Sequence, residues 1–249
     1  MKIVAIIQAR MGSTRLPGKM MVEIFNKPII EHVFERVKSS RLINEIWLAT
    51  TADKEDDVLA KWARLKVEKI YRGSNEDVLD RYFQAAKQAQ ADIIVRITGD
   101  CPLHDSQVID LVVKEFLSGS FDYVSNSHPP TYPDGLDVEV FSFQALKKAW
   151  EEAKLKSERE HVAPYIWKHP ELFKIKNVSS GIDLSKERWT LDTKEDFLFI
   201  SNILKECQAR KLDVNLKNIL SIIAIFPQWR NINLQYKRNE GYDKSINED

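Results

Sequence analysis

The chain has 249 residues, 43% of them apolar and 30% charged, and its 37 Lys and Arg residues balance its 37 Asp and Glu residues. This length and composition allow a full hydrophobic core, and zero net charge gives no overall field that would attract nucleic acid or an anionic membrane. Its two cysteines form no C-x-x-C pair, which argues against a disulfide framework and indicates a reducing, cytoplasmic setting. The N-terminal apolar run and the stretch 219–226 are too short for an export signal or a membrane span.

The first predicted element is a strand over 3–7, where β-branched residues follow one another without polar alternation, as in a strand covered on both faces. A loop rich in donors follows it. Glycines let a backbone approach an anion closely, and Arg and Lys together can grip non-equivalent phosphate oxygens. The loop therefore suggests a polyphosphate site, although its spacing alone fits a solvated basic turn equally well. Its cations, hydroxyls and glycines are Arg10, Arg15, Lys19, Ser13, Thr14, Gly12 and Gly18.

Alternating helices and strands come next. The expected helices begin at Pro28 and cover 54–65, 76–90 and 107–117, and the expected strands cover 46–50, 69–72, 92–97 and 123–125. This βαβα order predicts an α/β fold of three layers, with a mostly parallel sheet between two layers of helices. Right-handed crossovers bring the strand ends to one edge of such a sheet, where ligands bind.

The rhythm breaks at Asn126. A Pro-rich loop, a strand over 136–141 and helices over 143–153 and 158–168 predict a small β/α insertion, about 126–180, in a single domain of residues 1–230. A strand over 188–192 and a helix over 195–206 are expected to follow. Residues 231–249 are polar and predict a frayed C-terminal tail.

Two aspartates follow predicted strands directly, Asp100 and Asp192. Carboxylates that meet at a phosphate site invite Mg²⁺, which takes a few protein oxygens and completes its shell with water and phosphate. Each aspartate could instead cap the helix that follows it. Arg72 and Arg96 are further candidates, because Arg72 ends a strand, where it could also be merely solvated, and Arg96 lies within an apolar strand, where burial would demand a partner.

Several motifs, in order, resemble the sugar cytidylyltransferases, such as the CMP-KDO and CMP-sialic acid synthetases. The resemblance is closer to their relatives described as spore coat polysaccharide biosynthesis protein F, and it covers about the first 200 residues. The motifs that carry it are Gln8 to Lys19, Arg72 to Ser74 with Asp77 to Tyr82, Arg96 to Leu103, Tyr132 to Glu139, Ser157 to Val162 and Thr190 to Thr193.

The resemblance implies a Rossmann-like, nucleotide-diphospho-sugar transferase-like fold and Mg²⁺-dependent transfer of CMP from CTP to an acidic or phosphorylated sugar. Pyrophosphate would leave, the product would serve surface polysaccharide biosynthesis, and the chain would form a homodimer through the insertion. The implied nucleotide contacts are Ala9, Arg10, Gly12, Ser13, Arg15, Lys19, Arg72, Arg96 and Asp100, with Arg10, Arg15, Lys19 and Asp100 catalytic. The implied sugar contacts are Asp134, Asp137, Glu139, Arg159 and His161, and the implied metal ligands are Asp100 and Asp192.

Two other functions remain open. A glycosyltransferase of the same fold would use a nucleotide sugar and would usually show Asp-x-Asp at the metal strand, where this chain has Thr98-Gly99-Asp100. A non-catalytic nucleotide-binding module would bind CTP without releasing pyrophosphate. Arg159 and His161 begin a predicted helix, where a histidine is more often a surface or capping group than a substrate contact.

Overall fold

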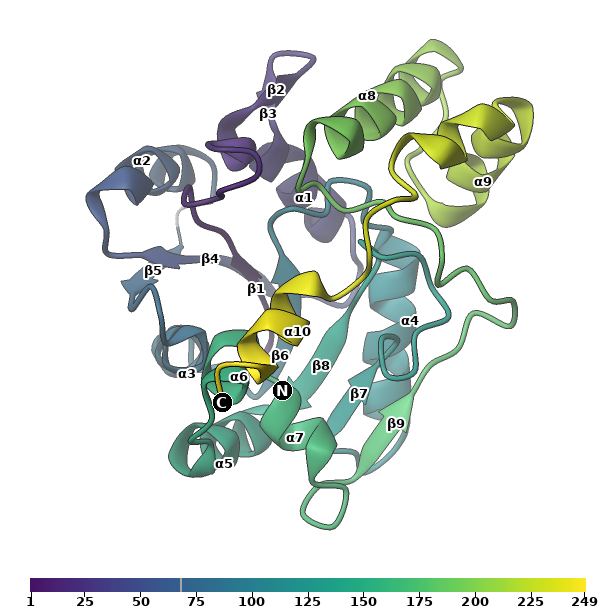
Figure 1. The fold of residues 1–249 in the computed structure, drawn as a ribbon. Helices are drawn as coiled ribbons and strands as arrows, with labels where there is room; N and C mark the ends of the chain where they lie inside the picture. Colours follow the sequence, from purple (N-terminus) through teal and green to yellow (C-terminus); the bar gives the residue numbers. More distant parts are fainter. Residues whose placement is uncertain (68) are drawn as a thin grey trace.

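A computed structural model describes residues 1–67 and 69–249. In this part of the chain, one sheet has the strand order β5-β4-β1-β6-β8-β7-β9 (Figure 1). Strands β5, β4, β1 and β6 run parallel, β8 is antiparallel to both neighbours, and β9 is parallel to β7. The strands are β1 (Ile3–Gln8), β4 (Glu45–Thr51), β5 (Ile70–Gly73), β6 (Ile93–Thr98), β7 (Tyr123–Ser125), β8 (Glu139–Ser142) and β9 (Ile175–Asn177).

Strand β1 separates two hydrophobic cores. Ile3, Ala5 and Ile7 belong to one core, whereas Val4 and Ile6 belong to the other, so every second side chain points to the same helix layer. The predicted three-layer α/β fold is confirmed. The first core holds helices α1 (Ile29–Lys38), α2 (Asp57–Lys66), α4 (Ser106–Ser118), α8 (Lys194–Ala209) and α9 (Leu216–Ile225); the second holds α3 (Val78–Gln88), α5 (Phe143–Glu152) and α7 (Pro164–Lys168).

Short elements complete the chain. After α9 the C-terminal segment runs back to α10, which lies beside α6 (Figure 1). Over the described ranges, no helix combines the length and the apolar character that a bilayer span requires. The short elements are η1 (Lys19–Met21), β2 (Glu23–Ile24), β3 (Lys27–Pro28), η2 (Lys54–Asp56), α6 (Lys156–His161), η3 (Pro227–Ile232) and α10 (Glu240–Ile246).

Three predicted elements differ from the structure. The helix expected over 158–168 is two helices, because Val162 has a left-handed φ of 73° and Pro164 begins a new helix. Residues 188–192 form no strand, since their backbone N–H groups donate to two different loops, Trp189 to Asp134 and Leu191 to Asp100, and they make only an isolated bridge with the first. The C-terminal residues expected to fray instead form α10. Helix α9 and strand β9 were not predicted.

The site is positioned by the parallel pairing of β1 with β6. Gln8 lies opposite Thr98 at the carboxyl ends of the two strands, so the loops that follow leave the same edge of the sheet. Gly99 makes this close approach possible, because a Cβ there would lie 2.8 Å from the Ala9 Cβ and 2.9 Å from the Gln8 carbonyl oxygen. The donor-rich loop and Asp100 are therefore neighbours.

Candidate functional site

Two adjoining cavities lie at this edge of the sheet. The larger, of about 510 Å³, is lined by the loop after β1 and is called here the loop cavity. The smaller, of about 300 Å³, is lined by Asp134, Asp137 and Glu139 and is called the acidic cavity. Both are lined by Arg15, Thr98, Asp100, His161, Asp192, Glu240 and Gly241.

Lys19 lies where the two aspartates meet. Its Nζ is 2.7 Å from Asp100 Oδ2, 2.7 Å from Asp192 Oδ1 and 2.9 Å from the Leu191 carbonyl oxygen. Burial would lower the pKa of Lys19, but the charges of Asp100 and Asp192 outweigh it and raise that pKa. Burial likewise opposes ionisation of Asp100, yet Lys19 lowers the Asp100 pKa to about 2. Lys19 and Asp100 are thus both charged at neutral pH.

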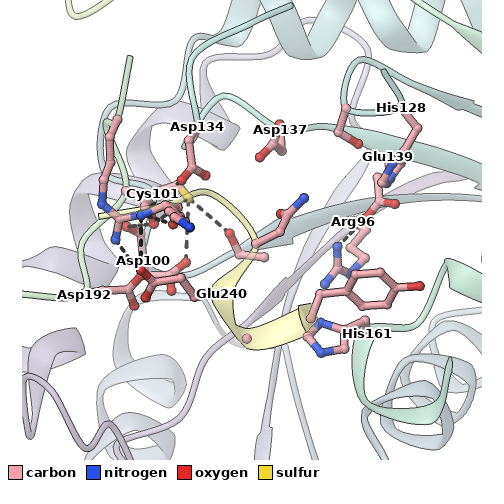
Figure 2. Close-up of a pocket in the computed structure, with 18 of the residues that line it drawn as sticks. Arg96, Asp100, Cys101, His128, Asp134, Asp137, Glu139, His161, Asp192 and Glu240 are labelled. Atoms are coloured by element: carbon pink, nitrogen blue, oxygen red, sulfur yellow. Dashed lines mark hydrogen bonds and ion pairs between the residues drawn. The ribbon is translucent and has the colours of Figure 1, made fainter. Parts of the chain in front are cut away.

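Two arginines extend this cluster. Arg15 places Nη2 3.1 Å from Asp192 Oδ2 and Nη1 2.6 Å from Glu240 Oε2. Arg188 places Nη2 3.0 Å from Asp192 Oδ2 and Nη1 3.1 Å from Asp134 Oδ2. Asp100, Asp192 and Glu240 gather on one side of the view in Figure 2. Asp192 therefore contacts three cations, whereas Asp100 contacts Lys19.

Asp100 and Asp192 do not cap the helices that follow them. The N-cap of α4 is Asp105 and that of α8 is Thr193. In the part of the chain that the structure describes, no three His, Cys, Asp or Glu side chains are grouped so as to hold a metal ion. Mg²⁺ needs only one or two carboxylates when phosphate and water complete its shell, so this pair of aspartates fits a magnesium ion shared with a phosphate.

The loop cavity presents donors toward open space. The loop is fixed by the Met11 N–H, which donates to Asp56 Oδ1 at 2.6 Å. Arg10 donates to Asn75 Oδ1 at 2.7 Å, and it forms no ion pair within the described ranges. Ala9, Gly12 and Ser13 also line this cavity. Its chemistry suits an elongated anion.

The acidic cavity combines carboxylates with an aromatic wall. Glu139 faces Arg96 across the β6–β8 register and pairs with its guanidinium (Figure 2). It also accepts from the Tyr123 hydroxyl at 2.5 Å. His128 stacks on Trp167 with ring centroids 4.6 Å apart. These groups together offer the donors, acceptors and flat faces that a polyhydroxylated ligand needs.

Asp134 and Asp137 share this cavity at close quarters. Burial and the neighbouring Asp137 raise the pKa of Asp134 to about 7, although Arg238 and Arg188 oppose the rise. Burial also raises the pKa of Asp137, which pairs with Arg238. Asp134 can therefore gain or lose a proton near neutral pH.

His161 lines both cavities. Its Nε2 lies 2.9 Å from the Ser245 hydroxyl oxygen. Burial, together with the positive charge of Arg96, lowers the pKa of His161 to about 4. The ring is therefore neutral at pH 7 and can offer one donor and one acceptor.

Arg72 and Arg159 line neither cavity. Arg72 donates to the Thr51 carbonyl oxygen at 2.8 Å and to Asp57 at 2.6 Å, which ties the end of β5 to its neighbours. Arg159 donates to the Trp150 carbonyl oxygen at 2.7 Å and pairs with Asp77 at the start of α3. Both guanidinium groups thus hold elements together in this structure.

The sequence did not predict that Arg188 and residues of the C-terminal segment would line the site, but they do. Glu240 and Tyr242 come from the segment that was expected to fray. Arg188 belongs to none of the motifs. The sequence feature that could have identified it is its position next to Trp189, whose side chain is fully buried. An arginine beside a buried tryptophan is itself held close to the interior and so needs carboxylate partners.

Comparisons with protein families, with known sequences and with solved structures find related proteins. A family model described as Cytidylyltransferase matches residues 4–221. An uncharacterized protein of Methanocaldococcus jannaschii is 41% identical over 235 residues, 94% of this chain and 95% of that protein. The spore coat polysaccharide biosynthesis protein SpsF of Bacillus subtilis is 28% identical over 233 residues, 89% of this chain and 93% of that protein. The solved structure of a cytidylyltransferase from Leptospira borgpetersenii superposes with a TM-score of 0.84 and 36% identity, covering 96% of this chain and 99% of that one.

Proposed function

This chain belongs to the cytidylyltransferase family and is a nucleotidyltransferase, and from that premise we propose that it transfers CMP from CTP to an acidic or phosphorylated sugar. Pyrophosphate leaves, and the activated sugar serves surface polysaccharide biosynthesis. The observation that carries the proposal is the meeting of Lys19, Asp100 and Asp192 where two cavities join. A transferase needs one pocket for each substrate and a charged junction between them.

The loop cavity would hold CTP. Backbone groups of Ala9, Gly12 and Ser13 would approach the phosphates, and Arg10 and Arg15 would pair with their oxygens. A sugar hydroxyl then attacks the α-phosphorus, the new P–O bond forms, and the bond to the bridging oxygen of pyrophosphate breaks. Positioning and neutralisation of the charge that develops on that oxygen supply most of the catalysis, without a covalent protein intermediate.

Asp100 and Asp192 would hold Mg²⁺ together with phosphate oxygens, and the ion would add positive charge at the reacting phosphate. The donor set supports this role, because two carboxylates suffice when the nucleotide supplies further oxygens. Asp134, Asp137, Glu139 and His161 would bond to the sugar in the acidic cavity. Arg96, paired with Glu139, lines the acidic cavity and not the loop cavity, so its contact would be with the acceptor sugar and not, as expected from the resemblance, with the nucleotide.

The insertion would also carry the contacts of a homodimer. It contains exposed leucines, with Leu155 41% and Leu172 42% exposed. Exposed apolar side chains are common on any surface, so the oligomeric state has to be tested by a direct measurement of mass.

The test is pyrophosphate release across a panel of nucleotides and sugars, with Mg²⁺ and with chelator. CTP with an acidic or phosphorylated sugar should give the highest rate, and chelation should abolish it. Asp100→Ala should lower the rate by about a hundredfold or more, the loss that follows removal of one charge-stabilising group. Asp213→Ala is the matched control, because Asp213 is exposed and lies outside both cavities.

Circular dichroism of both variants separates loss of activity from loss of fold. Full activity of a folded Asp100→Ala variant with Mg²⁺ would remove Asp100 from the mechanism. CTP binding without pyrophosphate release for any sugar would instead favour a nucleotide-binding module.

A further inference from the structure

The C-terminal residues 237–249, called here the strap, line both cavities. Lys237, Asn239 and Tyr242 face the acidic cavity, and Lys244 and Glu248 face the loop cavity. In Figure 2 the strap passes between the Asp192 cluster and His161. Access to either cavity therefore depends on where the strap lies.

Glu240 of the strap occupies one of the two Nη groups of Arg15. Its Oε2 accepts from Arg15 Nη1 at 2.6 Å, while Nη2 of the same guanidinium stays with Asp192. The Arg15 side chain is 39% exposed and the Glu240 side chain 30%. A phosphate oxygen that binds Arg15 through Nη1 would have to replace the Glu240 carboxylate, which also repels any phosphate in the loop cavity.

The strap is held by polar contacts and by Tyr242, whose ring packs edge-on against His161 with the ring centroids 5.1 Å apart. Ser245 is the one buried residue of α10; it contacts His161 and donates to Glu160 at 2.8 Å. At its end, Asp249 accepts from the Ser157 N–H at 2.7 Å and from its hydroxyl at 2.6 Å. Segments with few buried apolar contacts open at low free energy. Asn239, the residue before α10, has a left-handed φ of 62°, so the chain turns sharply where the helix begins.

We propose that the strap is a lid over both cavities, latched by Glu240 on Arg15, and that the phosphate chain of the nucleotide releases this latch. Glu240 is then a positioning residue that sets nucleotide affinity through Arg15. The inference rests on the proposed phosphate site around Arg15. Because the strap lines both cavities, its release by the nucleotide also opens the acidic cavity to the second substrate.

Calorimetric titration of the full chain with CTP and with inorganic tripolyphosphate tests the latch. Glu240→Gln keeps the size of the side chain. Its amide oxygen can still accept from the backbone N–H of Lys237, which donates to Glu240 Oε1 at 3.1 Å. Both ligands should bind about two- to fivefold more tightly to this variant, as expected when a partly exposed ion pair no longer competes. Asp243→Asn removes a charge from the same helix outside both cavities, and it should leave both affinities unchanged.

The Arg15→Ala background completes a double-mutant cycle, in which Glu240→Gln should raise affinity clearly less than it does in the wild type, because only the direct repulsion of phosphate remains. Hydrogen exchange separates a latch from a merely structural role of Glu240. If Glu240 is a latch, the amides of 240–246 should exchange faster when tripolyphosphate is added, whereas a structural role predicts no change. Weaker or equal binding by Glu240→Gln, or greater protection of these amides, would overturn the lid.

The two proposals fail separately. If the wild type releases pyrophosphate but Glu240→Gln leaves both affinities unchanged, the latch is wrong and the proposed function stands. If no sugar supports pyrophosphate release but tripolyphosphate binds more tightly to Glu240→Gln, the latch stands and the function is wrong. If neither ligand binds the wild type, both proposals are contradicted.

Discussion

Arg188 connects the carboxylates of the site to the interior. Its side chain is only 6% exposed, and besides Asp134 and Asp192 it contacts Asp196 at 3.0 Å. Asp196 is fully buried and also accepts from the backbone N–H groups of Asp192 at 2.9 Å and Thr193 at 3.0 Å. Arg188 is therefore the positioning residue for the start of α8 and for Asp192.

Replacing Arg188 with Ala should lower the free energy of unfolding by about 3 to 5 kcal/mol, because it leaves buried carboxylates without their counter-charge. Urea denaturation measures this loss. Arg210→Ala removes an arginine from an exposed i,i+4 pair with Glu206 at 2.7 Å, and it should cost about 0.5 kcal/mol or less. Equal losses in the two variants would show that Arg188 is not the centre of the network.

The sequence predicted the residues on both sides of the Lys19 ion cluster but not the C-terminal residues that join it. Asp100 and Asp192 come together because strand and loop ends of an α/β sheet share an edge, and the motif after β1 supplied Lys19. Glu240 could not be predicted, since its partner Arg15 is 225 residues away and no motif links them. The substrate roles of Arg72 and Arg159 stay predictions, although both lie outside the cavities.

The Pro-rich loop and the segment 187–192 are joined by backbone hydrogen bonds in both directions. The Trp189 N–H donates to the Asp134 carbonyl oxygen at 2.7 Å, and the Asp134 N–H donates to that of Glu187 at 2.9 Å. Gly135 has a φ of 108°, and a Cβ there would lie 2.7 Å from the carbonyl carbon of Trp189. The packing of these two backbones thus requires glycine.

Gly135→Ala should lower the free energy of unfolding by roughly 3 kcal/mol, because it adds a backbone clash to an unfavourable φ. Gly181→Ala is the matched control. Gly181 also has a left-handed φ, 78°, but a Cβ there would meet nothing within 4 Å, so its cost should be only about 1 kcal/mol. Thermal and urea unfolding of both variants measure the difference, and similar losses would contradict the clash.

The elements that the sequence misassigned share a cause. Apolar spacing predicted 158–168 as one helix, but the left-handed Val162 that divides it has no signature in residue type. The segment 188–192 places Trp189 and Leu191 two residues apart like the buried face of a strand, but their N–H groups donate to two loops, at Asp134 and Asp100, and to no strand. Tertiary contacts determined the structure in both cases. They also explain why the polar strap forms helix α10 instead of fraying.

Seen as a whole, the molecule separates its chemistry from a stabilising ion cluster at the opposite edge of the sheet. Glu45, at the amino end of β4, accepts from Lys2 at 2.9 Å, from Lys69 at 2.8 Å and from the Trp47 indole at 3.0 Å. Burial would raise the pKa of Glu45, but these bonds lower it from 4.5 to about 2. The cluster joins the start of the chain to the β4–β5 edge.

Stability should therefore depend on pH through Glu45. Because the folded-state pKa lies below the unfolded value, its contribution is present above pH 4.5 and is lost as pH falls to about 2. Glu45→Gln should be less stable than the wild type by about 1 to 2 kcal/mol at pH 7, a figure reduced for screening by water. The difference should vanish near pH 2. Urea midpoints at several pH values test this, and a constant difference would contradict it.

A homodimer through the insertion is a second prediction for the whole molecule. Analytical ultracentrifugation should give twice the chain mass of 28.9 kDa. Leu172→Glu should weaken the dimer, because Leu172 is an exposed apolar side chain of the insertion. Leu234→Glu, at a leucine 54% exposed outside the insertion, should leave the mass unchanged. A monomeric wild type would contradict the prediction.

The amine of Lys19 is the physical link between three stretches of chain: the loop after β1, the turn after β6 and the approach to α8. An isosteric methionine in its place would remove all three hydrogen bonds at once and leave Asp100 without the counter-charge that Lys19 supplies. Because Lys19 is buried, that loss would weaken the fold as well as the site. The same positive charge thus joins three distant stretches of chain and prepares the place where a phosphate would bind.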